Sequence, residues 1–346
     1  MPEPPAVEVT HGDAVPPLEA VRVEASSSAP SRSEYILFLP GAAHGSFYFE
    51  RMQALVSAEG YASVALTFDH ANGARALGWY CRQVLFAVLQ QPAGTQPVLW
   101  GHSLGAQVAM AYLAAHKRPW SDARAPEGKR AKGLVLWSPV LQGPGKKVML
   151  PQLMNQLKTA KECKAAADGI ARGAAAPQEG LRGKPRLREA DVHACWFLPT
   201  TTHTSLFSGE DPSAPASLEQ YAARCRATVD KLQRGVVFSS RQWVSGFKAK
   251  YGRARDIKVP SVLVCGQDEG EATQTPGPFR VTVLKSDITC PPKFARLGAA
   301  ALNIDGERCT LLEVAGQRHC LGDPGWEESA FAPALAALKK AMASPQ

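Results

Sequence analysis

The sequence predicts an α/β protein, in which a mostly parallel sheet is covered by helices on both faces and interrupted by a largely helical insertion. Short apolar runs recur along the chain, and each ends in Gly, Pro or Asp. Segments of helical length separate most of these runs, as expected for parallel strands joined by helical crossovers. No comparable apolar run occurs between Pro139 and Pro260, so we expect the insertion in this interval.

The individual elements follow from the same pattern. The apolar runs predict strands at residues 21–25, 35–41, 62–69, 97–101, 132–139, 260–268 and 309–316. The intervening segments predict helices at residues 49–59, 77–91, 106–116 and 331–342. In open sheets of this kind, reactive side chains gather at the carboxyl ends of the strands. Candidate catalytic residues are therefore expected directly after these runs.

The charge divides the chain into three parts. Residues 143–256 contain 19 Lys/Arg and 10 Asp/Glu, whereas the rest of the chain contains 20 and 21. We expect a first core part at 1–142, a basic and mainly helical cap insertion at 143–256, and a second core part at 257–346. The basic part lacks a recognisable nucleic-acid-binding motif, so we expect no nucleic-acid partner. A solvated basic surface is the simpler interpretation, and weak contact with an anionic substrate or membrane surface is the alternative.

The composition of the chain bears on where the protein is located and on whether it binds a metal or an organic cofactor. No apolar run approaches the length that spans a bilayer, and the first residues, MPEPP, lack the features of a secretory signal, so we expect a cytoplasmic protein. The eight cysteines are scattered without a Cys-x-x-Cys pair, which favours free thiols over disulfides or a metal site. We expect no metal and no organic cofactor, and the oligomeric state stays open.

The segment Gly101-His102-Ser103-Leu104-Gly105 lies between a predicted strand and a predicted helix. A sharp turn at this point forces the serine into a strained backbone conformation and raises its hydroxyl above the sheet. Side chains two positions away on either side would collide, which explains both glycines. The N-terminal N–H groups of the following helix suit an oxyanion. The pattern therefore predicts that Ser103 is a nucleophile.

A serine hydroxyl needs a base, and the base must be held by a third group. His319 follows the last predicted strand, where it would lie at the carboxyl edge of the sheet. His44 and His70 follow earlier strands and are expected to line a pocket. The remaining histidines lie in the N-terminal segment, near a helix end, within the elbow itself or in the insertion. His319 is therefore the candidate base.

The order of nucleophile, acid and histidine, with a helical cap after the strand that follows the elbow, resembles the α/β-hydrolase family. The likeness runs from about Tyr35 to the C-terminal helix, and it implies an eight-stranded, mostly parallel sheet. The segment LPGAAHGSFYFERMQALVSAEGYASVALTFD, residues 39–69, resembles the part that carries the family's oxyanion loop. This implies that the backbone N–H groups of Ala42 and Leu104 form the oxyanion hole. The segment RHCLGDPGWEESAFAPALAAL, residues 318–338, is similar to the family's terminal histidine and helix.

The triad acid has three candidates. Asp268 ends the run PSVLVCGQD, and a residue tethered to the strand end could reach His319 with little freedom. Glu269 occupies the position that the resemblance gives to the acid, and Asp287 resembles the downstream half of the same motif, separated by an insertion at residues 270–287. Our preferred acid is Asp268, with Glu269 and Asp287 as alternatives.

These residues together predict a serine hydrolase that cleaves a carboxylic ester, small or lipid-like, through an acyl-enzyme intermediate. Aromatic residues of the expected cap would line an apolar pocket together with His44; they are Trp196, Phe197, Phe207 and Trp243. Acyl transfer, thioester cleavage, perhydrolysis or lyase chemistry on the same triad is an alternative, and so is a non-catalytic ligand-binding protein of this fold.

Overall fold

The computed structural model describes residues 18–28, 32–41, 44–69, 77–115, 117–139, 254–267, 272–274, 282–284, 292–303, 308–315 and 326–343. Almost all of the expected cap, residues 143–256, lies outside these ranges. Its helical character and the three-part division of the chain therefore stay predictions.

One sheet holds seven strands in the order β1-β3-β2-β4-β5-β6-β9. The strands are β1 (Glu19–Val23), β2 (Glu34–Leu39), β3 (Ala62–Thr67), β4 (Gln96–His102), β5 (Gly133–Trp137), β6 (Ser261–Gly266) and β9 (Cys309–Val314). Neighbours pair in parallel except β1, which is antiparallel to β3. All seven strands expected from the sequence are present, with ends shifted by at most two residues. The implied eighth strand is not confirmed over the described residues.

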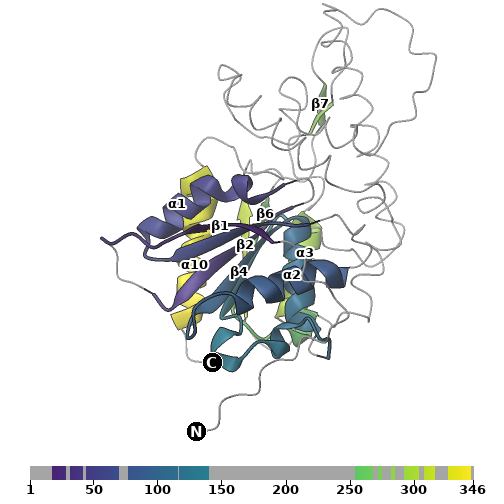
Figure 1. Cartoon of the computed structure of the whole chain (residues 1–346). Helices are drawn as coiled ribbons and strands as arrows, with labels where there is room; N and C mark the ends of the chain where they lie inside the picture. The colour runs from purple at the N-terminus through teal and green to yellow at the C-terminus, as the bar shows by residue number, and fades with distance from the viewer. Residues whose placement is uncertain are drawn as a thin grey trace, which may run out of the picture.

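Helices cover both faces of the sheet, as expected. Figure 1 shows α1 (Glu50–Ala58) and α10 (Ala332–Ala343) on one face, and α2 (Leu77–Leu89) and α3 (Leu104–Ala114) on the other. A further helix, α9 (Pro292–Leu302), packs in the same core as α2 and α3. The sequence pattern did not predict α9.

The alternation of side chains along the strands explains why the strands are apolar throughout. Ile36 and Phe38 of β2 pack in the core beneath α1 and α10, whereas Leu37 and Leu39 pack in the core beneath α2 and α3. Because successive side chains of a strand point to opposite faces, a strand between two helical layers must be apolar at every position.

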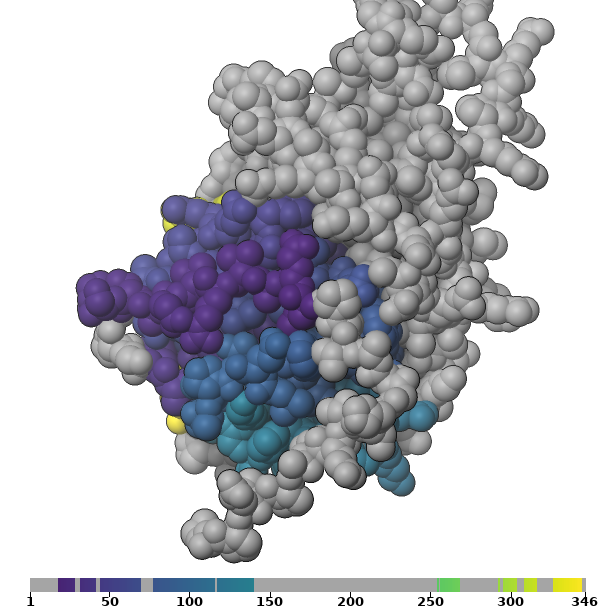
Figure 2. All heavy atoms as spheres, viewed as in Figure 1, coloured from purple at the N-terminus to yellow at the C-terminus, as the bar shows by residue number. Residues whose placement is uncertain are grey.

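The edge strand β1 differs from the strands inside the sheet. Its first four residues are exposed, and only Val23 is partly covered. Figure 2 shows this strand, in dark purple, on the surface of the molecule. An antiparallel strand at an edge can present one face to water, so β1 lacks the continuous apolar pattern of its neighbours.

Two short strands, β7 (Ala272–Gln274) and β8 (Thr282–Leu284), pair antiparallel with each other and form a second sheet. They lie in the stretch treated as an insertion between the acid candidates, and the sequence pattern did not predict them. Among the described residues, no helix is long and apolar enough to cross a membrane.

Candidate active site

The predicted turn between strand and helix is present at Ser103, which directly follows β4 and directly precedes α3. Ser103 has φ 52° and ψ −113°, a backbone conformation that residues other than glycine rarely adopt. Its side chain is almost fully buried, with 6% exposed. This is the strained elbow that the sequence pattern predicts, and it directs the hydroxyl to the carboxyl edge of the sheet.

The two flanking glycines are required by close backbone contacts. A Cβ atom on Gly105 would lie 2.0 Å from the carbonyl oxygen of Leu39 at the end of β2. A Cβ atom on Gly101 would lie 2.6 Å from backbone atoms of Ala106 in α3. Both separations are shorter than any non-bonded contact allows, so only glycine lets β2, β4 and α3 meet at the nucleophile.

Backbone hydrogen bonds hold the turn against the next strand and the next helix. The N–H of Ser103 donates to the carbonyl of Trp137 in β5 at 3.0 Å, and the carbonyl of Ser103 accepts from the N–H of Ala106 at 3.1 Å. Leu104 is the first residue of α3, and the first N–H groups of a helix have no acceptor within the helix. Leu104 therefore lies at a helix start directly after Ser103, and its role in the oxyanion hole stays a prediction.

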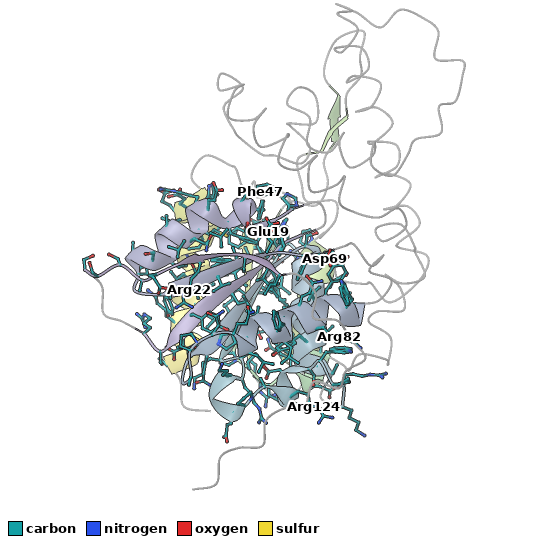
Figure 3. The ribbon with its side chains drawn as sticks, in the orientation of Figure 1. Glu19, Arg22, Phe47, Asp69, Arg82 and Arg124 are labelled. Carbon is teal, nitrogen blue, oxygen red and sulfur yellow. The ribbon has the colours of Figure 1, made fainter. Side chains whose placement is uncertain are left out.

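The loop after β2 reaches the nucleophile. A Cβ atom on Gly41 would lie 3.1 Å from Cβ of Ser103 and 2.8 Å from Nδ1 of His102. The next residue, Ala42, lies outside the described residues. Gly41 brings the loop after β2 close to Ser103, and the predicted role of Ala42 as an oxyanion donor stays a prediction. Phe47 and Asp69, which follow β2 and β3, can be located at this edge of the sheet in Figure 3.

Two histidines and a tyrosine form a buried cluster beside Ser103. The ring of His102 stacks on Tyr48 with centroids 4.6 Å apart, and His44 meets His102 edge-on at 5.5 Å. His44 is 3% exposed and His102 is 1% exposed. The structure therefore places His44 near the nucleophile but packed against aromatic rings, and its predicted contact with substrate stays a prediction.

The other predicted site residues lie outside the described residues. They are the base His319, the acid candidates Asp268, Glu269 and Asp287, the oxyanion donor Ala42, and the pocket residues His70, Trp196, Phe197, Phe207 and Trp243. The strands that lead to two of them are described: β6 ends at Gly266, two residues before Asp268, and β9 ends at Val314, five residues before His319. Because β4, β5, β6 and β9 pair in parallel one after another, β6 and β9 both end at the edge that carries Ser103.

Ser138 is a residue of this edge that the sequence reasoning missed. It directly follows β5, has φ 42° and is fully buried, and its hydroxyl has no hydrogen-bond partner among the residues that the structure describes. Ser103 and Ser138 are the two residues other than glycine with positive φ in the described chain. The sequence offers no signal for this conformation, because a residue before proline, here Pro139, is usually extended.

Comparisons with known proteins agree with this geometry. The model of the alpha/beta hydrolase family matches residues 36–330. No curated protein matches the chain at a significant level.

Several solved structures are similar in fold. A probable hydrolytic enzyme from Pseudomonas aeruginosa PAO1 is 14% identical with a TM-score of 0.52, and the alignment covers 94% of this chain and 90% of that one. A lipase in an open form is 14% identical with a TM-score of 0.50, covering 94% and 95%. A monoacylglycerol lipase from Paleococcus ferrophilus is 17% identical with a TM-score of 0.47, covering 94% and 98%. Because the family model spans most of the chain, the chain belongs to the alpha/beta hydrolase family.

Proposed function

We propose that this protein is a serine hydrolase that cleaves a carboxylic ester through an acyl-enzyme intermediate. Membership of the alpha/beta hydrolase family supports hydrolase activity in general. The observation that carries the finer proposal is the backbone of Ser103, which is held at φ 52° between β4 and α3. Such strain persists only where the surrounding structure enforces it, and it is concentrated at functional sites.

In the proposed reaction, the hydroxyl oxygen of Ser103 attacks the ester carbonyl carbon, and His319 takes the hydroxyl proton. His319 then returns this proton to the leaving alkoxide, so that an alcohol departs and the acyl group remains on Ser103. A water molecule then attacks the acyl carbon while His319 takes one of its protons. The bond between the acyl carbon and the Ser103 oxygen breaks, His319 returns the proton to that oxygen, and the carboxylic acid leaves. Asp268 is proposed to hold the imidazole in place.

The negative charge on the carbonyl oxygen needs donors that are already in position. The N–H groups of Ala42 and Leu104 are proposed for this role, one after β2 and one at the start of α3. Removing one donor of an oxyanion hole typically lowers the rate by about 10²–10³. The close approach of Gly41 to Ser103 supports this arrangement, because it brings the β2 loop to the nucleophile.

The substrate is proposed to be a small or lipid-like ester. Residues 143–256 are proposed to form the cap, with aromatic residues that supply an apolar acyl or alcohol pocket. The surplus of Lys and Arg in this segment supports a secondary role in attracting anionic substrates or surfaces. That role would weaken as the ionic strength rises.

The test is Ser103→Ala, assayed on p-nitrophenyl esters of increasing chain length and with a fluorophosphonate probe that labels active serines. We expect the variant to lose ester hydrolysis and labelling while unfolding like the wild type, since alanine is smaller than serine. Ser261→Ala is the matched control. Ser261 is also buried, but it is the first residue of β6 and therefore lies at the amino end of the strand, away from the edge that carries Ser103.

Three results would contradict the proposal. If Ser103→Ala keeps more than a few per cent of the wild-type turnover, the nucleophile is another residue. If the wild type neither hydrolyses esters nor reacts with the probe, the protein is a binding protein of this fold. If it reacts with the probe but transfers the acyl group to an acceptor other than water, it is a transferase.

A further inference from the structure

The imidazole of His102, the residue before the nucleophile, lies against the chain that follows β2. His102 is the last residue of β4 and is almost fully buried. A Cβ atom on Gly41 would lie 2.8 Å from its Nδ1 and 3.2 Å from its Cε1. The ring of His102 therefore fills the space that a side chain on Gly41 would need, and the backbone of Gly41 comes close to this edge of the ring.

Two other rings from the chain after β2 contact the same imidazole. Tyr48 stacks on its face with an interplanar angle of 24°, and His44 meets it edge-on at 90°. His44 also meets Tyr48 edge-on, with ring centroids 4.6 Å apart. Each of these three rings, which we call the ring cluster, thus contacts the other two. The chain after β2 is packed around the side chain of His102.

Hydrogen bonds connect this chain to itself and to the neighbouring strand. The N–H of His44 donates to the carbonyl of Gly41 at 3.2 Å, so a shift of one residue is passed to the other. Ser46 begins a short 3-10 helix, η1 (Ser46–Phe49), and its N–H donates to the hydroxyl oxygen of Thr67 at 2.9 Å. The chain after β2 is therefore attached to β3 at one point and packed on the imidazole at another.

The ring of His102 has a fixed position relative to the nucleophile. His102 is paired with Trp137 of β5, and the N–H of Ser103 donates to the carbonyl of the same Trp137 at 3.0 Å. Both residues are thus held by β5. A Cβ atom on Gly41 would lie 3.1 Å from Cβ of Ser103, so Gly41 lies close both to the imidazole and to the side chain of Ser103.

We propose that His102 is a positioning residue, whose ring holds Gly41 and residues 44–48 in place beside the side chain of Ser103. This inference rests on the proposed function, in which Ser103 is the nucleophile. Without the ring, the cavity lets the chain after β2 shift, and Gly41 no longer limits where the Ser103 side chain points. A misplacement of about 1 Å in a catalytic site can lower the rate by about 10².

The experiment measures kcat and KM on a p-nitrophenyl ester for His102→Ala and His102→Phe. We expect His102→Ala to lower kcat by about 10- to 100-fold and to change KM by less than about twofold, since orientation of the nucleophile is needed for the chemical step. His102→Phe should restore most of the kcat, because a phenyl ring can stack on Tyr48 although it has no nitrogen atoms.

Two tyrosine variants give a matched comparison that leaves the elbow unchanged. Tyr48→Leu removes the ring stacked on His102 and should lower kcat by about 10-fold. Tyr61→Leu is its control, because Tyr61 is buried in the same core but directly precedes β3, at the sheet edge opposite Ser103. It should lower the urea midpoint about as much as Tyr48→Leu and keep kcat within about twofold. The double variant of His102→Ala and Tyr48→Leu should be little slower than His102→Ala, because both changes remove one stack.

Amide hydrogen exchange of the folded proteins gives a measurement that needs no activity. We expect peptides from residues 44–49 to exchange faster in His102→Ala than in the wild type, and to be unchanged in His102→Phe and Tyr61→Leu. If His102→Ala does not fold, His102→Leu replaces it, since leucine fills volume but cannot stack.

The outcomes separate this inference from the proposed function. If the wild type hydrolyses esters but Tyr48→Leu and Tyr61→Leu lose kcat equally, the ring cluster has only a structural role and the inference is wrong. If His102→Phe is as slow as His102→Ala, the nitrogens of the imidazole are needed rather than its packing, which also overturns it. Unchanged exchange of residues 44–49 in His102→Ala would do the same. If the wild type shows no serine reactivity, the proposed function fails, and faster exchange would then show only that the ring holds the chain after β2.

Discussion

At the scale of single residues, the site is defined by backbone strain at two neighbouring strand ends. Ser103 after β4 and Ser138 after β5 both have positive φ and both are buried. The glycine spacing predicted the first conformation because small residues on either side of a serine indicate a tight turn. Nothing in the local sequence indicates the second, because a residue before proline is usually extended; in the structure the N–H of Ser138 donates to the carbonyl of Val264 in β6.

The first prediction concerns Gly105. Gly105→Ala should prevent folding or lower the free energy of unfolding by more than about 4 kcal/mol, because its Cβ would lie 2.0 Å from the Leu39 carbonyl oxygen. Gly128→Ala is the control, since a Cβ atom at Gly128 meets nothing within 4 Å. Urea unfolding followed by circular dichroism measures both. Equal stability of the two variants would show that β2 and α3 do not approach closely at the elbow.

A second prediction identifies the triad acid. Asp268→Asn, Glu269→Gln and Asp287→Asn each keep the size of the side chain but remove the charge that stabilises the imidazolium. In a well-studied serine protease triad, the equivalent change lowers kcat by about 10⁴. We expect a loss of that order in Asp268→Asn alone, measured on a p-nitrophenyl ester with the other two variants as controls. Near-normal kcat in Asp268→Asn would exclude our assignment.

At the scale of elements, the seven strands and four helices expected from the apolar pattern are present. They could be predicted because strands buried between two helical layers are apolar at nearly every position. Of the elements that were missed, β7, β8 and the π-turn at Glu327–Phe331 lack an apolar pattern of this kind, whereas α9 has an apolar face that the sequence reasoning did not recognise. The strands β7 and β8 are three residues long and pair only with each other, which is too short for an alternation to be recognised. The π-turn Glu327–Phe331 lies in a segment with ordinary helical composition, and the rings of Trp326 and Phe331 meet edge-to-face across it.

At the scale of the whole molecule, burial sets the protonation of several thiol and phenol groups in the core. Burial raises the pKa of the Cys81 thiol well above 9.0 and that of Cys309 to about 12. The pKa values of the Tyr112, Tyr35 and Tyr80 phenols are likewise raised above 10.0 by burial. The folded protein therefore favours the neutral form of each group, whereas the unfolded chain ionises at the ordinary values.

The last prediction is the pH dependence that follows. Because these folded-state pKa values are raised, the stability is fully present below pH 9.0, where the unfolded thiol is still neutral, and falls as the pH rises above it. Each such group contributes a slope of about 1.4 kcal/mol per pH unit between its unfolded and folded pKa values. Urea unfolding at increasing pH should show this decline in the free energy of unfolding. In Cys81→Ala, the decline per pH unit should be smaller by about the contribution of one group. An unchanged slope in that variant would mean that the Cys81 thiol ionises in the folded protein.

The sequence by itself determined the α/β class, the seven strands and the position of Ser103, since each depends on residues close together in the chain: apolar periodicity, or glycines two positions from a serine. Only the tertiary structure decided the strain at Ser138, the close approach of Gly41 to Ser103, the stacking of Phe331 on Trp100 and the edge-on contact of Trp326 with Trp137. These features join residues that are tens to hundreds of positions apart, and a contact between distant segments is fixed by how strands pair and helices pack, which no local pattern encodes.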